Sequence, residues 1–294
     1  QYSFIGEPDA YGGRFHLDAS ALSLTREAGA DSRKLSLAGG WSLPYYAPAG
    51  DVYTLTASVQ SDAYSANNPT SAITGPASGE EAITGRVFPQ LGLNWRFPFL
   101  KTTRSSSQTI EPILNFVAGP NGGNPSEIPN EDSQAFEFDD TNIFELNRFE
   151  GSDRVTSGGR IDYGLKAALF ETDLGASQLF IGQSYQLWGS SAFDSGSGLD
   201  TDISDYVGRV QLAPADWLDL LFRFRLDKDS FKPRRSELGL RITQPNYSLL
   251  VDYVLLNEQL STTNFGNREQ LDFSLNWRFN DRWSTSTRLV QDLS

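Results

Sequence analysis

The residues best placed to do chemistry lie in one short stretch, in which two arginines and two carboxylates surround a glycine. Arg148 and Arg154 bracket Glu150 and Asp153 in the sequence. Guanidinium groups form paired, bidentate hydrogen bonds with carboxylates, and a glycine such as Gly151 permits a turn with positive φ. Such pairs join segments of chain without breaking any bond. We therefore expect them to fold a loop.

Catalytic groups of the usual kinds are scarce in this chain. It contains no cysteine and one histidine, His16, so histidine-based zinc sites and Ser-His-Asp catalysis are nearly excluded. Asp18 lies two residues from His16, hence on the same side of a strand, and this is the nearest approach to a catalytic pair. We expect no enzyme activity and no cofactor.

Two acidic clusters could bind a hard cation through carboxylate oxygens, but neither has the spacing of a calcium loop. The first comprises Glu131, Asp132, Glu137, Asp139, Asp140 and Glu145, and the second comprises Asp194, Asp200, Asp202 and Asp205. The simpler interpretation is a solvated acidic loop for the first cluster and a flexible Gly/Ser-rich loop for the second. We expect no metal site.

The elements that must position these residues alternate between apolar and polar side chains. In 217–227, leucines and phenylalanines at the even positions alternate with Asp219, Arg223 and Arg225. Period-two alternation predicts strands with one apolar and one polar face. About thirteen strands are expected: 14–25, 33–43, 52–64, 86–97, 108–118, 160–170, 176–188, 205–212, 217–227, 234–244, 246–257, 269–280 and 282–291.

The length of these strands favours a membrane sheet over a soluble one. Many have about ten or more residues, whereas strands of soluble proteins have about five or six and tilted membrane strands need about 9–11. Their polar faces then suit a wet lumen, although in a soluble sandwich they would face bulk water. No run approaches the roughly 18 apolar residues of a membrane helix.

The connections between strands also alternate in length. Tight turns are expected at 214–216, 244–246 and 280–282, and longer polar loops at 65–84, 119–159, 189–204, 227–235 and 258–267. Short turns at one rim, toward the periplasm, and long loops at the other are typical of outer-membrane barrels. Six tryptophans near strand ends suit an aromatic belt: Trp41, Trp95, Trp188, Trp217, Trp277 and Trp283. We expect an all-β, antiparallel transmembrane β-barrel.

The strand count predicts a partial barrel. Bacterial single-chain barrels have even numbers of strands, and thirteen is odd. The residues 288–294 end directly after a strand without a closing aromatic residue, and Gln1–Phe4 shows no signal peptide. We expect 1–294 to be a single region of a larger barrel, with 119–159 as a long inserted loop.

Charge and composition exclude some partners. The net charge of −13 argues against binding nucleic acid and against simple attraction to an anionic membrane surface. Hydrophobic residues make up 38% and aromatic residues 12% of the chain. This combination suits a barrel with a lipid-facing exterior and a polar interior, and it also suits a large soluble β-protein.

A series of short motifs around the long loop resembles a known family. The series runs Gln108–Pro112, Ile128–Ser133, Asn142–Phe144 and Asn147–Arg154. In this order the motifs resemble the LptD family of lipopolysaccharide-assembly proteins, most strongly over about 86–170. The residues that carry the resemblance, as structural or lumen-facing positions, are Glu111, Pro112, Pro129, Asp132, Ser133, Asn142, Phe144, Asn147, Arg148, Phe149, Gly151, Asp153 and Arg154.

The resemblance implies a barrel of about 26 strands in the Gram-negative outer membrane. It also implies an N-terminal periplasmic domain that meets the periplasmic Lpt bridge proteins, and a lumen plugged by an LptE-type lipoprotein. Lipopolysaccharide would leave sideways into membrane lipid, between the first and last strands. This chain departs from the family in lacking the periplasmic domain, the gate strands and the paired cysteines, so it corresponds to the middle of the barrel.

Two functions remain in view. The first is part of the outer-membrane translocon that inserts lipopolysaccharide into the outer leaflet. The second is a passive or substrate-specific porin, complete in itself, with an even strand count and a loop that constricts the pore. For Arg148 and Arg154, a packing role is favoured over one in which they meet lipid phosphates in transit.

Overall fold

The computed structural model describes residues 1–25, 31–67, 81–133, 136–172, 175–256 and 268–293. Within these ranges the chain forms one antiparallel sheet of fifteen strands, and no helix is long and apolar enough to cross a membrane. The strands are β1 (Tyr2–Ile5), β2 (Arg14–Leu24), β3 (Ser32–Tyr46), β4 (Val52–Asn67), β5 (Glu81–Arg96), β6 (Phe99–Thr102), β7 (Ser106–Ala118), β8 (Gly159–Glu171), β9 (Gly175–Trp188), β10 (Tyr206–Ala215), β11 (Leu218–Leu226), β12 (Pro233–Thr243), β13 (Tyr247–Leu256), β14 (Arg268–Asn280) and β15 (Trp283–Asp292).

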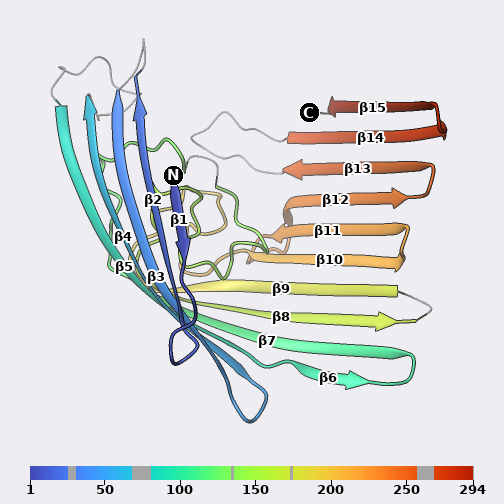
Figure 1. Ribbon diagram of the computed structural model, residues 1–294, viewed down its shortest axis with the longest axis horizontal. Coiled ribbons are helices and arrows are strands. Elements are labelled where there is room, and N and C mark those ends of the chain that lie inside the picture. The colour runs from blue at the N-terminus through green and yellow to red at the C-terminus, as the bar shows by residue number, and fades with distance from the viewer. Residues whose placement is uncertain (26–30, 68–80, 134–135, 173–174, 257–267, 294) are drawn as a thin grey trace.

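Strands that follow one another in sequence lie side by side, from β1 at one edge of the sheet to β15 at the other, except that β5 and β6 both pair with β7. Figure 1 shows a strongly bent sheet, in which β2–β5 run across the direction of β7–β15. Within the described ranges β1 pairs with β2 and β15 pairs with β14, and the two edges do not pair with each other. The sheet is therefore open, which confirms the expected all-β fold and partial barrel.

All thirteen expected strands are present, but the expected count was two too low. The additional strands, β1 and β6, have four residues each, too few to show an alternation. β6 continues the line of β5, because both pair with β7 in one register, Arg96 opposite Ile113 and Phe99 opposite Ile110. Pro98 lies in the interruption between them, where its missing N–H removes a ladder hydrogen bond.

Pro112 was expected to cause a bulge or weakened pairing, and it affects one side of β7. Toward β8 the ladder runs through Pro112, opposite Leu165, without a register shift. Toward β5 and β6 the ladder is interrupted at Pro112, and its carbonyl accepts one hydrogen bond from the Phe97 N–H at 3.2 Å. The two prolines thus weaken the same short part of one strand pair.

The sheet has one apolar and one polar face, as the alternation predicted. Phe222, Leu238 and Tyr253 form one cross-strand row on the apolar face, and Leu238 is 49% exposed. The neighbouring row carries Arg223 and Glu237 on the polar face. The polar face lies inside the bend, and its central residues are buried by loops rather than by a second sheet.

The connections alternate in length, which confirms the expected pattern of rims. Tight turns join β10 to β11, β12 to β13 and β14 to β15, whereas 119–158 and 189–205 leave from the other ends of the strands. The central part of the expected loop 65–84, residues 68–80, and the whole of the expected loop 258–267 lie outside the described residues. Trp217 and Trp283 border tight turns, whereas Trp41 lies within β3.

Candidate functional site

The segment between β7 and β8, residues 119–158, lies inside the bend against the polar face of the sheet (Figure 1). We call it the inner loop. Two groups of buried charges attach it to the sheet, one to β3–β5 and one to β8 and β9. Between them, a third segment of the inner loop meets β10–β12.

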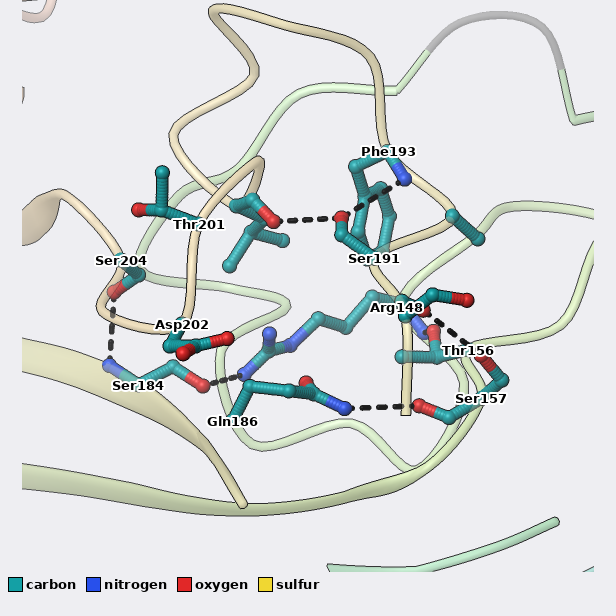
Figure 2. Close-up of a pocket in the computed structure, with 13 residues that line it drawn as sticks. Arg148, Thr156, Ser157, Ser184, Gln186, Ser191, Phe193, Thr201, Asp202 and Ser204 are labelled. Atoms are coloured by element: carbon teal, nitrogen blue, oxygen red, sulfur yellow. Dashed lines mark hydrogen bonds between the residues drawn. The ribbon is translucent and has the colours of Figure 1, made fainter. Parts of the chain in front are cut away.

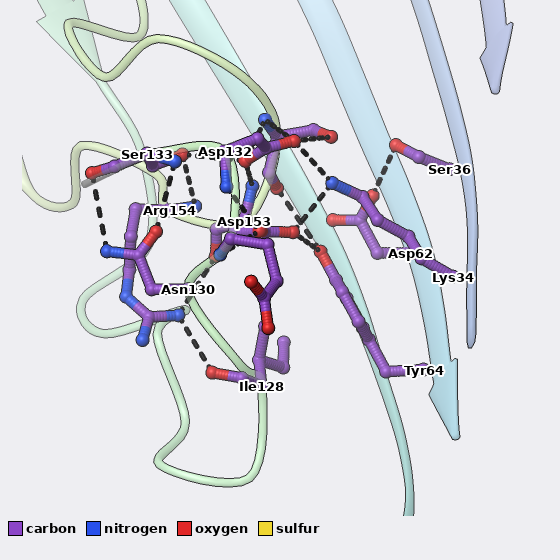
Figure 3. Close-up of polar contacts among 12 residues, drawn as sticks. Lys34, Ser36, Asp62, Tyr64, Ile128, Asn130, Asp132, Ser133, Asp153 and Arg154 are labelled. Carbon is purple, nitrogen blue, oxygen red and sulfur yellow. Dashed lines mark hydrogen bonds and ion pairs between the residues drawn. The ribbon is translucent and has the colours of Figure 1, made fainter. Parts of the chain in front are cut away.

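The first attachment is a reciprocal clamp between two carboxylates of the inner loop (Figure 3). Asp132 accepts hydrogen bonds from the backbone N–H groups of Ser152 and Asp153, at 3.1 and 2.9 Å. Asp153 in turn accepts from the N–H groups of Glu131 and Asp132, at 2.7 and 3.0 Å. Lys34 of β3 donates to both carboxylates, at 2.7 and 2.6 Å. One lysine of the sheet therefore binds two parts of the inner loop that are far apart in the sequence.

Gly151 is required at the tight turn of this clamp. Its φ is +72°, as expected for the glycine of the motif, and an added Cβ would lie 2.3 Å from the Asp132 carboxyl carbon. Ser133 supports the same turn, because its hydroxyl donates to the carbonyl of Glu150 at 2.5 Å. The turn thus fits only a residue without a side chain.

An arginine of the sheet donates hydrogen bonds to backbone carbonyl groups next to the clamp. Arg86 of β5 donates to Asp62 of β4 at 2.9 Å through Nε. Its two terminal nitrogens donate to the carbonyls of Gly123, Ser152 and Asp153. Arg86 and Asp62 are both buried, so this part of the first attachment is shielded from solvent.

The second attachment is a buried carboxylate held between two arginines. Asp162 of β8 is fully buried, and Arg148 of the inner loop and Arg160 of β8 approach it at 2.5 and 3.2 Å. Arg148 also donates to the hydroxyl of Ser184 at 2.8 Å (Figure 2). It donates to the carbonyl of Ile143 at 3.0 Å as well. Burial lowers the pKa of the Arg148 guanidinium to about 9, although Asp162 opposes the change. The guanidinium is engaged on several sides by protein.

Glycines of the polar face form shallow sockets for apolar residues of the inner loop. Three glycines of β5, β8 and β9 lie directly under loop side chains, where an added Cβ would collide or press. The distances from that Cβ are 2.6 Å for Gly92 to Leu146, 3.1 Å for Gly164 to Phe144 and 2.8 Å for Gly182 to Ile143. The missing side chains let the loop pack close to the sheet.

The third segment corrects the expectation of a solvated acidic loop. Glu137 and Asp140 point at arginines of β10–β12 instead of bulk water. Asp140 lies 3.1 Å from Arg209 and 3.4 Å from Arg223. Glu137 lies 3.2 Å from Arg235 and 3.6 Å from Arg225. In the second expected cluster, Asp205 lies 4.0 Å from Arg225.

The expected ion pairs of Arg148 and Arg154 with Glu150 and Asp153 are wrong, because the arginines have other partners. Arg148 pairs with Asp162 rather than with Glu150 or Asp153. Arg154 donates to the carbonyls of Ile128 and Asp153, at 3.0 and 3.2 Å, and the cation at Asp153 is Lys34. Sequence spacing could not reveal these partners, because Lys34 is 119 residues from Asp153.

The remaining motif residues support the inner loop locally, except for two on β7. Asn142 donates to the carbonyl of Glu137 at 2.6 Å, and Asn147 donates to that of Arg154 at 3.0 Å. Phe149 stacks on Phe193 with ring centroids 4.5 Å apart. Pro129 is half-buried next to the buried Ile128, Glu111 lies 3.9 Å from Arg96 on the polar face, and Pro112 belongs to the opposite face.

Comparison with known proteins identifies the family. A family model described as "LptD: LPS transport system D" matches residues 1–283. The LPS-assembly protein LptD of Nitrosospira multiformis is 28% identical over 196 residues, which cover 64% of this chain and 20% of that protein. Those of Polaromonas sp. and Albidiferax ferrireducens are 26% and 24% identical, over 63% and 71% of this chain and 22% and 26% of theirs.

This chain thus spans about a fifth to a quarter of the length of these curated relatives. The matched range includes β1–β14, the inner loop and both of its attachments. The chain belongs to the LptD family, LPS transport system D.

Proposed function

We propose that this chain forms part of the wall of an outer-membrane barrel that delivers lipopolysaccharide to the outer leaflet of a Gram-negative bacterium. The observation that carries the proposal is the two-faced sheet of a chain in this family. Its apolar face suits the hydrocarbon of a bilayer, and its polar face suits the sugar and phosphate groups of a lipopolysaccharide. The names of the relatives, LPS-assembly protein LptD, support the same substrate.

The orientation follows from the two rims of the sheet. The tight turns face the periplasm and the long connections the exterior, as in other outer-membrane barrels. Residues 1–294 then form a single barrel region, and 119–159 is an insert that the barrel folds inward. No bond is made or broken, so the chain acts as a transport component and not as an enzyme.

The motif residues act by holding the inner loop in place. Hydrogen bonds and ion pairs within the protein engage Asp132, Arg148 and Asp153, and Gly151 forms the turn between them. In this proposal, groups other than these contact the lipid phosphates. A porin complete in itself needs a closed barrel with an even number of strands, whereas the described residues form an open sheet of fifteen strands. This favours a gated transporter over the alternative of a passive porin.

The partners in this proposal are those of the whole family member. Periplasmic Lpt bridge proteins deliver lipopolysaccharide to an N-terminal periplasmic domain, and an LptE-type lipoprotein plugs the lumen. The lipid then leaves into the outer membrane through a gate formed by other strands of the barrel. The chain described here contributes the wall and the inner loop.

The function is tested by complementation. In a Gram-negative host depleted of its own transporter, the full-length protein that contains this chain restores lipopolysaccharide at the cell surface, measured by surface labelling. If the correctly inserted protein fails to restore it and instead conducts small solutes across planar bilayers, the porin alternative replaces this proposal.

The role of the motif is tested by Arg148→Ala and Asp153→Ala in the same protein. We expect less folded barrel, measured by heat-modifiable gel migration, and normal export per folded molecule. Variants that reach wild-type levels of folded barrel but do not export lipid would contradict the packing role.

A further inference from the structure

Strands β10–β12 carry an unusual arrangement of like charges on the polar face of the sheet. Arg209 of β10 lies directly across the ladder from Arg223 of β11. One row further along, Arg225 of β11 lies directly across from Arg235 of β12. Like charges directly opposite each other destabilise a sheet. We call these four residues the arginine quartet. A folded sheet that carries them requires negatively charged groups nearby.

The inner loop supplies two of the required anions. Asp140 bridges one of the two pairs and Glu137 bridges the other. Glu237 of β12 pairs with Arg235, and Asp205, which directly precedes β10, lies near Arg225. The four arginines and these two carboxylates leave +2, and the two carboxylates of the inner loop bring the sum to zero. A displaced inner loop therefore uncovers a site with an excess of two positive charges.

The loop carboxylates fit the quartet loosely. Their contacts with the arginines are 3.1–3.6 Å long, whereas charge-assisted hydrogen bonds are about 2.7–2.9 Å and those of Lys34 are 2.6–2.7 Å. Glu137 Oε1, Asp140 Oδ1 and Arg223 Nε are buried without a hydrogen-bond partner among the described residues. The inner loop thus neutralises the quartet through long contacts, whereas Arg235 also donates to Glu237 at 3.0 Å and Arg225 donates to the Ser197 carbonyl.

The protonation of Asp140 supports the same conclusion. Burial raises the pKa of its carboxyl above the usual value, although Arg223 and Arg209 act in the opposite direction. The ionised form is therefore less favoured in the docked position than in water. By contrast, the pKa of Asp132 in the first attachment lies below its usual value. The two attachments are firm, and the segment around Asp140 is held weakly between them.

We propose that the arginine quartet is a binding site for a phosphomonoester on a saccharide, and that Glu137 and Asp140 occupy it as an internal competitor. Arginine matches phosphate with a bidentate fork, and a phosphomonoester carries about −1.5 to −2 charges at pH 7, which balances the uncovered +2. The proposal rests on the proposed function, because it assigns the quartet to the phosphorylated headgroup of the transported glycolipid.

The competitor also explains how a ligand leaves such a charged site. Transport through a pore requires binding that is favourable enough for entry and weak enough for release. While the two attachments hold the ends of the inner loop, the carboxylates leave when a phosphate enters and return when it departs. The four arginines are thereby always neutralised, either by the two carboxylates or by the phosphate.

The first test measures binding to the full-length protein in detergent micelles, by calorimetric titration. The probes are inorganic phosphate and a phosphorylated glucosamine disaccharide without acyl chains. The double variant Glu137→Gln/Asp140→Asn removes the competitor, and Asp139→Asn is the matched control, because the Asp139 carboxylate accepts from Thr141 instead of an arginine.

We expect the double variant to bind the disaccharide about tenfold more tightly than the wild type, as for a site that is blocked in nine of ten molecules. The control should stay within about twofold of the wild type. Equal affinities in all three proteins overturn the internal competitor. Equal affinities for inorganic phosphate and disaccharide overturn the assignment to a glycolipid headgroup.

A second pair of measurements covers the case in which an arginine variant does not fold. Arg209→Gln/Arg223→Gln should lose disaccharide binding, with folding checked by heat-modifiable migration. In the wild type, the disaccharide should speed hydrogen exchange in 136–142 and leave 148–156 unchanged. Undiminished binding by the folded arginine variant, or exchange that slows in 136–142, overturns the proposal. These results are independent of lipid export, so an exporting protein without phosphate binding refutes the quartet alone.

Discussion

At the scale of residues, the inner loop is held by charges that are buried, except for the partly exposed Asp132. Asp162 pairs with both Arg148 and Arg160, and Lys34 pairs with both Asp132 and Asp153. Buried ions are tolerated when they are paired and hydrogen-bonded, and loss of one partner leaves an uncompensated charge. The sequence motif therefore identifies a loop that depends on a few wall residues.

Asp162→Asn should strongly destabilise the folded barrel, because it leaves two buried guanidinium groups without a carboxylate. The expected loss is about 3–5 kcal/mol of unfolding free energy, measured by thermal and urea unfolding in micelles. Glu150→Gln is the control, since Glu150 is an exposed carboxylate on the inner loop, two residues from Arg148. Similar losses in the two variants would show that Asp162 is no special anchor.

Gly151→Ala should weaken the clamp more than a backbone effect alone. Gly122 has a similar positive φ, +79°, but an added Cβ there meets nothing within 4 Å. Both alanine variants therefore incur the cost of a left-handed residue, about 1–2 kcal/mol, whereas the Cβ at position 151 also displaces Asp132. A lower midpoint of thermal unfolding for Gly151→Ala than for Gly122→Ala is expected. Identical midpoints contradict the clamp.

The clamp should also depend on pH through Asp132. Burial opposes ionisation of Asp132, but the hydrogen bonds from Lys34 and from backbone N–H groups outweigh it and lower the pKa from 3.8. The stabilisation is therefore complete above pH 3.8 and is lost as the pH falls toward the folded-state value. The difference in melting temperature between the wild type and Asp132→Asn should shrink from pH 6 to pH 2. A constant difference would exclude this linkage.

At the scale of elements, alternation predicted the long strands because their two faces meet different surroundings. β1 and β6 escaped this rule, since four residues are too few to show a period and Pro98 hides the continuity of β5 with β6. The inner loop was predicted in extent and in its Gly151 turn. Its partners were not, because Lys34 lies 98 residues from Asp132 and no spacing rule connects them.

The glycine sockets give a prediction at the same scale. Gly182→Ala should push the inner loop away from β9, because the added Cβ would lie 2.8 Å from Ile143. Gly39→Ala on β3 is the control, since its nearest contact is 3.7 Å away. Limited proteolysis should cut within 136–146 faster in Gly182→Ala than in Gly39→Ala or the wild type. Equal cutting rates would show that the socket does not hold the loop.

At the scale of the whole molecule, the proposed transport depends on a sheet with one apolar and one polar face. The alternation of apolar and polar residues predicted these two faces. The unpaired edge strands of the described sheet are consistent with part of a larger barrel. How the inner loop fills the bend could not be derived from sequence, because it depends on which wall residues meet at a distance. The arginine quartet on β10–β12 likewise becomes visible only through strand register.

The most direct test is a spin-label scan along β14, in a chain that has no cysteine of its own. Single cysteines at 271–276, in the full-length protein in bilayers, carry the labels. We predict that labels at Leu271, Phe273 and Leu275 collide mainly with oxygen dissolved in the lipid, and those at Asp272, Ser274 and Asn276 mainly with a water-soluble nickel chelate. Uniform accessibility along the strand, or alternation of the opposite phase, would contradict the account.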